Sequence, residues 1–409
     1  MDPVVLIVFG IVYLGMLAGR LPFLAIDRTG VAVLGAIALL ASGRLNLKEV
    51  WDAQDVPTLA LLLGFMVLSA QLRLGGFYSR VTQRIAGAQV SPVRLLGLVI
   101  AVAGILSALL ANDIVCLAMA PLLAHGCWRR GLDPIPFLLA LACASNVGSA
   151  ATLIGNPQNM LIGQALALDF AGYAKTALVP SVLGLGLTWG LLGWLYRERW
   201  ELPASAATSE PPDAETPDFN AWQTSKGLAL VVLTVAAFLF SDWPREVLAL
   251  AAAGICLASR RMATRPMLGL VDWHLLLLFM GLFVVNHALQ ASGALDTAIR
   301  SVRESGIDPA HPGWLFGVTV ALSNLVSNVP AVMLLLPVAT HEQAGPILAL
   351  ASTLAGNLIL VGSIANLIVA EQAGMLGLKI DWKTHARVGV PVTLSTLAVA
   401  AGWLWLTAG

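Results

Sequence analysis

The sequence is poor in charge. Asp, Glu, Lys and Arg make up 11% of its 409 residues, whereas soluble domains carry about 25%. The 23 basic and 23 acidic residues balance, so no net positive field is present to attract a nucleic acid. With 58% hydrophobic residues, the composition excludes a disordered chain, a nucleic-acid binder and an ordinary cytosolic enzyme. It indicates a polytopic membrane protein whose surface is largely covered by the lipid bilayer.

Several chemical signatures are missing as well. The four cysteines lie in apolar runs without C-x-x-C spacing, which argues against a disulfide framework or a zinc site. No phosphate-binding loop, HExxH metal motif or nucleophile elbow occurs in the sequence. We therefore expect no metal, no cofactor and no enzyme activity. The N-terminus lacks the basic segment of a signal peptide, so the first apolar run is expected to remain as a span.

Runs without charged residues cover most of the chain, and a membrane span needs about 20 mostly apolar residues. Runs 134–168 and 343–370 have polar centres rich in Asn, Gly, Ser and Thr. Polar tips, Ala111-Asn112-Asp113 and Ser327-Asn328, interrupt runs 95–128 and 309–341. Backbone at membrane depth cannot stay unpaired, so such breaks must be buried in protein or line a wet cavity. A simple kink could explain any one break, but four breaks in two matched pairs favour a functional role.

The breaks recur at matching positions in two halves of the chain. The ordered matches are Asp55 with Asp272, Gly64 with Gly281, Ser107 with Ser323, Asn112 with Asn328, Pro121 with Pro337, Gly155 with Gly362 and Asn159 with Asn366. We predict a first repeat at 1–200 and a second at 225–409. A solvated, disordered linker at 201–224, rich in Pro, Ser, Thr and acidic residues, joins them.

Each repeat is expected to hold three spans, a re-entrant hairpin, a broken helix and a final span. The hairpins are placed at about 95–128 and 309–342, and the broken helices at about 134–168 and 343–376. Five crossings per repeat would invert the second repeat relative to the first. The predicted fold class is therefore an all-α integral membrane bundle of two inverted repeats, which is typical of secondary transporters.

The distribution of positive charge predicts the orientation. If the linker lies in the cytoplasm, most of the 23 Lys and Arg residues fall on cytoplasmic segments, as the positive-inside rule requires. Both termini then face outward. The amphipathic stretches 73–88 and 292–304 occupy equivalent positions in the two halves, as interfacial helices or as plain loop helices.

Asp113 is the sharpest chemical signal, because it is a carboxylate in the tip between two apolar stretches. An ionisable group inside a membrane is costly and is functional by default. Removal from water favours the protonated form of a carboxyl group, so we expect Asp113 to bind and release the coupling proton. The alternative is that Asp113 lies at an aqueous tip, or that it caps the amides of Cys116 and Leu117.

Neutral polar residues in the four breaks are the candidate substrate ligands. Asn112, Asn328 and Ser327 begin half-helices, where we expect their side chains to cap free amides and the helix N-termini to face an anion. The remaining candidates are Ser145, Asn146, Thr152, Gly155, Asn156, Asn159, Gly356, Asn357, Gly362, Ser363 and Asn366. Such groups can bind either an uncharged hydroxide compound, which carries O–H groups, or an anion. No Arg or Lys lies inside a break, which weighs against a bidentate carboxylate clamp.

At these residues the chain resembles the ion transporter superfamily. It is similar to the citrate-transporter-like permeases, which include the arsenite permease ArsB, the NhaD-type sodium/proton antiporters and the divalent-anion/sodium symporters. The motifs are Ala111-Asn112-Asp113, the stretches 145–148 and 152–159, Ser327-Asn328-Val329-Pro330 and the stretch 356–366. The resemblance implies two hairpins and two unwound loops around one site, an elevator-like moving domain, a homodimer and a bacterial-type inner membrane.

The hairpin tips depart from the symporter pattern Ser-Asn-Thr. Both asparagines are present, but Asp113 and Val329 stand where that pattern has threonine. We therefore favour proton-coupled movement of a small inorganic ion or oxyacid, such as arsenite or antimonite, with efflux preferred. Sodium-coupled dicarboxylate or citrate transport and NhaD-like sodium/proton exchange are the alternatives. A channel or an integral-membrane enzyme is a weaker alternative.

Overall fold

The structure is a computed structural model that describes residues 2–19, 26–201 and 218–407. Within these ranges the elements are helices, and no extended strand occurs, so the expected all-helical class is confirmed. The first part of the chain contains α1 (Pro3–Ala18), α2 (Arg28–Ala41), α3 (Leu47–Asp52), α4 (Val56–Leu74), α5 (Phe77–Ala86), α6 (Pro92–Leu109), α7 (Asn112–Trp128), α8 (Pro134–Ser149), α9 (Pro157–Ala165) and α10 (Phe170–Leu195).

The second part contains α11 (Ala221–Phe240), α12 (Arg245–Leu257), α13 (Thr264–Leu268), α14 (Trp273–Ala291), α15 (Ala294–Glu304), α16 (Pro312–Val326), α17 (Asn328–Leu335), η1 (Leu336–Val338), α18 (Ala344–Ala355), η2 (Leu360–Gly362), α19 (Ile364–Met375) and α20 (Trp382–Leu406). Helix α11 begins at Ala221, inside the range expected for the linker. Most of that predicted linker, 202–217, lies outside the described residues.

Aspartates at the helix starts explain where several helices begin. The Asp272 carboxylate accepts a hydrogen bond from the Leu275 amide at 2.9 Å at the start of α14. Asp169 and Asp381 cap α10 and α20 in the same way. A side-chain oxygen at this position satisfies an amide that has no partner within the helix.

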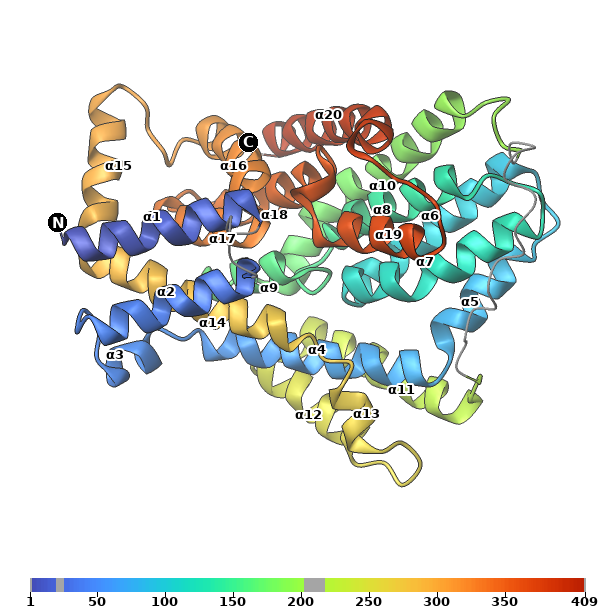
Figure 1. The fold of residues 1–409 in the computed structure, drawn as a ribbon, viewed down its shortest axis with the longest axis horizontal. Coiled ribbons are helices and arrows are strands. Elements are labelled where there is room, and N and C mark those ends of the chain that lie inside the picture. Colours follow the sequence, from blue (N-terminus) through green and yellow to red (C-terminus); the bar gives the residue numbers. More distant parts are fainter. Residues whose placement is uncertain (1, 20–25, 202–217, 408–409) are drawn as a thin grey trace.

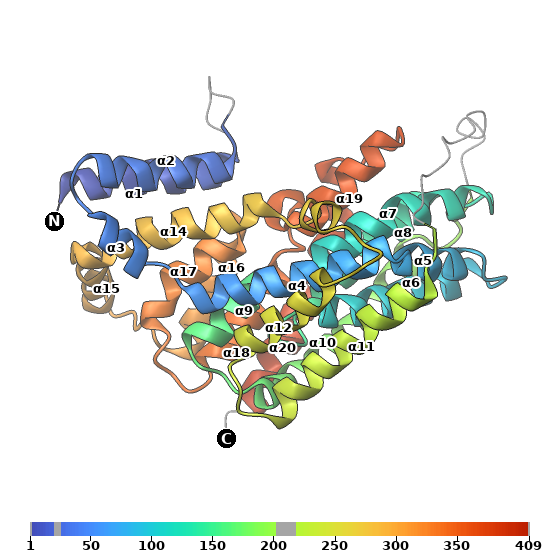
Figure 2. The same cartoon turned by 90° about the horizontal axis from the view of Figure 1, so that it is seen from below.

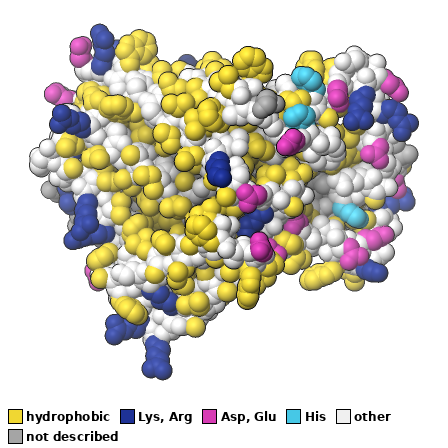
Figure 3. Space-filling view, turned by 180° about the vertical axis from the view of Figure 1, so that it is seen from behind, with side chains coloured by type: hydrophobic (Ala, Val, Ile, Leu, Met, Phe, Trp, Pro, Cys, Tyr) yellow, Lys and Arg dark blue, Asp and Glu magenta, His cyan; other side chains and the backbone are white. Residues whose placement is uncertain are grey.

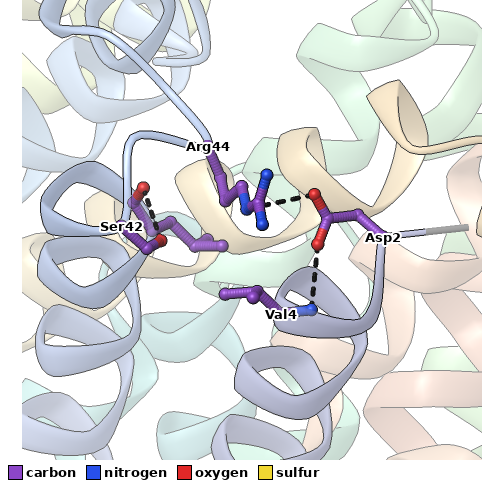
Figure 4. Close-up of polar contacts among 5 residues, drawn as sticks. Asp2, Val4, Ser42 and Arg44 are labelled. Atoms are coloured by element: carbon purple, nitrogen blue, oxygen red, sulfur yellow. Dashed lines mark hydrogen bonds and ion pairs between the residues drawn. The ribbon is translucent and has the colours of Figure 1, made fainter.

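The beginning of α1 is fixed to the turn after α2. The Asp2 carboxylate accepts from the Val4 amide at 2.9 Å and pairs with the Arg44 guanidinium at 3.1 Å (Figure 4). Ser42, at the end of α2, donates to the Leu39 carbonyl. Both charged side chains are partly exposed, so the ion pair contributes little stability but sets where α1 and α2 meet.

Two close helix contacts join the two parts of the chain. A Cβ atom on Gly64 of α4 would lie 2.7 Å from the Ala249 Cβ of α12. Likewise, a Cβ atom on Gly281 of α14 would lie 2.7 Å from the Ala32 main chain of α2. Glycine is required at both positions because the helix backbones are in contact. Thus α4 packs on α12 and α14 packs on α2, each helix against a partner from the other part of the chain.

The two hairpins approach the centre from opposite directions. In Figure 1 the pair α6–α7 lies in the right half of the view and α16–α17 in the left half. The short helix after each break packs against the hairpin of the other part of the chain: α9 packs against α17, and α19 packs against α7. Figure 2 shows α1 and α2 side by side at one edge of the molecule. The hairpin tips and the breaks in α8–α9 and α18–α19 therefore meet in the interior.

The molecular surface fits a bilayer. Among the described residues, six helices are long and apolar enough to cross a membrane: α4, α6, α10, α11, α14 and α20. Further apolar helices of 10–17 residues include α1, α2, α8, α16 and α18. Figure 3 shows hydrophobic side chains over much of one face, with charged side chains toward opposite edges and a smaller group of both signs near the middle. Such a distribution is expected of a bundle that crosses a bilayer.

Candidate functional site

The first hairpin tip, between α6 and α7, is held by several hydrogen bonds. The Asn112 amide donates to the Gly155 carbonyl at 3.3 Å, and the Ser145 hydroxyl donates to the Asn112 carbonyl at 3.2 Å. The Ser107 and Ser145 hydroxyls lie 2.9 Å apart, and Thr152 donates to the Ala108 carbonyl. The tip is therefore fixed to α8 and to the break that follows it.

The second hairpin tip, between α16 and α17, is less well bonded. Ser327 has φ of 79° and ψ of 160°, a conformation that costs a non-glycine residue about 1–3 kcal/mol. Among the described residues the Ser323 hydroxyl and the side-chain oxygens of Asn324 and Asn328 have no hydrogen-bond partner. Buried polar atoms without partners are rare in folded proteins and point to a missing ligand or a strained state.

The expectation that Asn112, Asn328 and Ser327 cap the half-helices is wrong. Helices α7 and α17 begin without a side-chain cap. Asn112 is 5% exposed and its side-chain oxygen has no partner among the described residues. The tight hairpin turns direct these side chains away from their own helix amides, so their oxygens remain available to another group. The alternative role for Asp113 as a cap is not observed either, because α7 has no side-chain cap.

The first break, residues 150–156 between α8 and α9, is held by Thr353 from the other part of the chain. The Asn156 and Gln158 side chains donate to the Thr353 hydroxyl at 3.1 and 3.2 Å. The same hydroxyl donates to the Asn159 side-chain oxygen at 3.2 Å. Asn159 also donates to the Thr152 carbonyl at 2.9 Å. All these amides are buried, and they serve to hold the break in shape.

The second break, residues 356–363 between α18 and α19, is held in the reciprocal way by Asn146 of α8. The Asn146 amide group donates to the side-chain oxygens of Asn357 and Asn366 at 2.7 and 3.1 Å. The Asn146 oxygen accepts from Ser363 at 2.9 Å and from Asn112 at 3.3 Å. By the sequence spacing that matches Gly155 with Gly362, Asn146 corresponds to Thr353. Each residue thus binds the break of the opposite half.

Main-chain carbonyls set the orientation of this amide network. Asn366 must donate to the Gly356 carbonyl at 2.8 Å and Asn357 to the Cys143 carbonyl at 3.3 Å, since a carbonyl oxygen can only accept. Their own oxygens then accept from Asn146, whose oxygen accepts in turn from Asn112. That bond uses one of the two N–H donors of the Asn112 side chain, and the Asn112 side-chain oxygen has no donor among the described residues.

A small cavity of about 30 Å³ lies between the two hairpin tips. Its lining includes six of the predicted site residues together with Pro157, Gln158, Leu275, Val329 and Ile364; the six are Asn112, Asp113, Asn146, Ser327, Asn328 and Ser363. The half-buried Asp113 carboxylate has no hydrogen-bond or ion-pair partner among the described residues. The cavity therefore collects oxygen acceptors, namely one carboxylate and the free oxygens of Asn112 and Asn328.

Two larger cavities lie next to this one. A cavity of about 550 Å³ reaches the second tip at Ser327 and Pro330, and is lined also by Asp27, Arg28 and Asp272. Another of about 180 Å³ contains Asp113, Arg73 and Asp272 among apolar side chains. Asp272 and Leu275 line both of them. The second hairpin tip and Leu275 therefore separate the central cavity from the larger space.

The other predicted residues do not line the central cavity. Ser145, Thr152, Gly155, Asn156, Asn159, Gly356, Asn357, Gly362 and Asn366 instead form the framework around it. The structure adds Gln158, Thr353, Tyr173 and His385, which bond to the breaks. Thr353 could have been found as the match of Asn146. No group of three metal-binding side chains occurs among the described residues.

Comparison with known proteins is consistent with this architecture. Residues 4–355 match the citrate transporter family model. The chain is 31% identical to the Escherichia coli inner membrane protein YbiR over 82% of this chain and 84% of that protein. It is 28% identical to the rice silicon efflux transporter LSI3 over 96% and 95%. The fold is similar to the crystal structure of the Alcanivorax borkumensis YdaH transporter, with a TM-score of 0.61, 15% identity, and coverage of 100% and 99%.

Proposed function

Since the chain belongs to the citrate transporter family and is a membrane transporter, we propose that it moves a small oxyacid or inorganic ion across the membrane in exchange for protons. Asp113 carries the proton in this proposal. Asn112, Asn328, Asn146, Ser327 and Ser363 contact the substrate. The framework residues of the two breaks hold these side chains in place.

The observation that carries this proposal is the set of unpaired acceptors around the central cavity. The carboxylate of Asp113 and the side-chain oxygens of Asn112 and Asn328 have no donors within the described residues. A solute with several O–H groups supplies such donors, and a cation would also bind. No Lys or Arg lines the cavity, so a multiply charged anion has no cationic partner there. A neutral oxyacid fits this chemistry best.

Size supports the same substrate class. The cavity of about 30 Å³ is large enough to hold a water molecule and is far smaller than a pocket for a drug-sized ligand, which measures about 300 Å³ or more. A small oxyacid needs a modest opening at Ser327 and Val329. The similarity to the rice silicon efflux transporter, whose name specifies silicon, an element that forms oxyacids, supports the same substrate class.

Protonation of Asp113 couples the movement of protons to the movement of substrate. Ionised Asp113 accepts hydrogen bonds from a hydroxylated solute, whereas protonated Asp113 has lost part of that acceptor capacity. Proton and substrate therefore compete for the same oxygens, and each occupant drives the other out. Exchange across the membrane requires that the loaded site is exposed to one side at a time.

We infer that the halves 1–200 and 225–409 are inverted repeats. The reciprocal packing of α4 on α12 and of α14 on α2 supports this, as do the opposed hairpins in Figure 1 and the exchange of bonds through Asn146 and Thr353. In an inverted-repeat transporter, one half-bundle moves against the other around a fixed site. The hairpins and broken helices would form the moving, elevator-like part, and a homodimer of the remaining helices the scaffold.

The proposed orientation places the linker in the cytoplasm and both termini outside. The cavity of about 550 Å³ is lined by the end of α1 and the start of α2, at Ala18 and Arg28. With the N-terminus outside, this end of α1 lies at the cytoplasmic face. The structure would then be an inward-facing form in which the second tip closes the site.

The test is proton-driven flux in vesicles containing the purified protein. Arsenite is the first probe, because it is a small oxyacid that is neutral near pH 7. For Asp113→Asn we expect loss of pH dependence and a fall in flux of about tenfold or more, as removal of a charged hydrogen-bond partner costs about 1.5–3 kcal/mol. Asp296→Asn is the matched control, since this carboxylate is exposed on α15 and lines none of the three cavities. Unchanged pH dependence in Asp113→Asn would remove Asp113 from the mechanism.

A second candidate is sodium-coupled transport of citrate or another dicarboxylate. The description of the matching family favours it, and the missing tip threonines and the lack of a basic residue in the cavity argue against it. Sodium-dependent citrate uptake by the same vesicles, without arsenite flux, would establish this alternative.

A further inference from the structure

A buried histidine bonds to the second break. His385 lies in the first turns of α20 and is 1% exposed. Its Nε2 atom lies 2.9 Å from the main-chain oxygen of Asn357. A carbonyl oxygen only accepts, so Nε2 carries the hydrogen and donates it. His385 therefore fixes the backbone near the start of the second break, at Asn357.

The α20 backbone is in direct contact with the same carbonyl group. A Cβ atom on Gly389 would collide with the Asn357 oxygen and would lie 2.8 Å from His385 Nε2. Glycine at this position allows the helix to come close enough for the hydrogen bond. The contact leaves little room for the Asn357 carbonyl to turn elsewhere.

Asn357 connects this contact with the site. Its side-chain oxygen accepts from Asn146 at 2.7 Å, and Asn146 bonds in turn to Asn112 and Ser363, which line the central cavity. Movement of the Asn357 backbone would remove one of the two acceptors that hold the Asn146 amide group. The free acceptor of Asn112 would then lose its fixed direction.

The first half contains the same contact with a different side chain. Tyr173 lies one turn after Asp169, the cap of α10, as His385 lies one turn after Asp381, the cap of α20. The Tyr173 hydroxyl donates to the Ala150 carbonyl at 2.7 Å. By the spacing that matches Gly155 with Gly362, Ala150 corresponds to Asn357. In both halves, therefore, a donor from the last helix holds the carbonyl at the start of the break.

We propose that His385 is a positioning residue: its Nε2–H fixes the second break, and through Asn357 and Asn146 it aligns the substrate-binding oxygens. The role at the substrate site rests on the proposed function, whereas the effect on the break does not. Tyr173 has the equivalent task for the first break. Ala150 has no side-chain amide to pass the effect on, so substrate binding depends more strongly on His385.

The test compares His385→Gln, which keeps an N–H donor at similar reach, with His385→Leu, which has none. Hydrogen exchange is measured on the full-length protein in lipid nanodiscs. For His385→Leu we expect exchange of the amides in 356–363 to accelerate about tenfold or more, while 150–156 stays protected, because the opening is local. His385→Gln should restore protection. Tyr173→Phe should give the reverse pattern, with faster exchange in 150–156.

Arsenite flux in vesicles provides the second measurement. For His385→Leu we expect KM to rise about tenfold with a smaller change in maximal flux, as expected when binding groups are misaligned, and His385→Gln should restore KM. Three results would overturn the proposal. In His385→Leu, hydrogen exchange could accelerate equally across the whole protein, or it could fail to accelerate in 356–363. The third result is a His385→Gln variant that behaves like His385→Leu. If the wild-type protein moves no arsenite, the substrate assignment fails, and the exchange experiment still decides the role of His385 at the break.

Discussion

The two hairpin tips match in sequence but differ in how they are held. The first tip is bonded to α8 and to the first break through Ser107, Ser145 and Asn112. The second has a strained Ser327 and an unpaired Ser323 hydroxyl, and it borders the cavity of about 550 Å³. The acid, Asp113, lies on the fixed tip, and Val329 stands at the matching position of the other. This contrast supports a model in which the first hairpin holds the proposed coupling group steady and the second hairpin opens.

The largest expected contrast concerns the glycines of the two breaks. A Cβ atom on Gly155 would collide with the Ser149 main chain and lie 2.7 Å from the Ser107 carbonyl. On Gly362 the nearest atom would be the Gly356 carbonyl, at 3.0 Å. We expect Gly155→Ala to destabilise the protein by about 3 kcal/mol and Gly362→Ala by about 1 kcal/mol. Thermal unfolding in detergent measures both, and equal losses would contradict a tighter first half.

The next contrast concerns the residues that bind the opposite break. Asn146→Leu removes four hydrogen bonds. The amide group of Asn112, the Ser363 hydroxyl hydrogen and the side-chain oxygens of Asn357 and Asn366 lose the partner that Asn146 provides, and each unpaired buried group costs about 1–3 kcal/mol. Thr353→Val removes one hydroxyl that bonds to three side chains of the framework, none of them a free acceptor. We expect arsenite flux to be abolished in Asn146→Leu and reduced in Thr353→Val, and size-exclusion chromatography checks that each variant is folded. Full activity of Asn146→Leu would disprove the network's role.

The smallest contrast compares the matched serines of the two hairpins. Ser107→Ala removes a buried hydrogen bond to Ser145 and should lower the free energy of unfolding by about 1 kcal/mol. Ser323→Ala removes a hydroxyl without a partner, so it should be neutral or stabilising. Unfolding midpoints of the two variants, measured side by side, check the sign. Destabilisation by Ser323→Ala would show that the second hairpin is held by bonds absent from this structure.

Much of the architecture can be read from the sequence, because lipid imposes strong patterns. The apolar runs predict an all-helical membrane protein, and the polar interruptions at 111–113, 145–159, 327–328 and 356–366 lie where the helices stop. Asp113 and Asn112 stand out because polar groups are costly at those positions. The matched asparagines and glycines indicate that the two halves of the chain, 1–200 and 225–409, have similar sequences.

The division between cavity and framework could not be predicted. Asn156 and Asn328 look equally good as ligands in the sequence, but Asn156 is used up by Ser149 and Thr353, while Asn328 keeps a free oxygen. That outcome depends on contacts between residues far apart in the chain. His385 gave no local signal, since a histidine near a helix start resembles any surface histidine until its carbonyl partner is known.

The exchange of bonds through Asn146 and Thr353 also bears on biosynthesis. Translation delivers Asn146 long before Asn357, Ser363 and Asn366 leave the ribosome, so its amide has no permanent partner in the newly inserted first half. The early bundle must hold this polar group in water or against temporary neighbours until the last helices are inserted. We therefore expect two separately expressed halves to fold only when they are produced together.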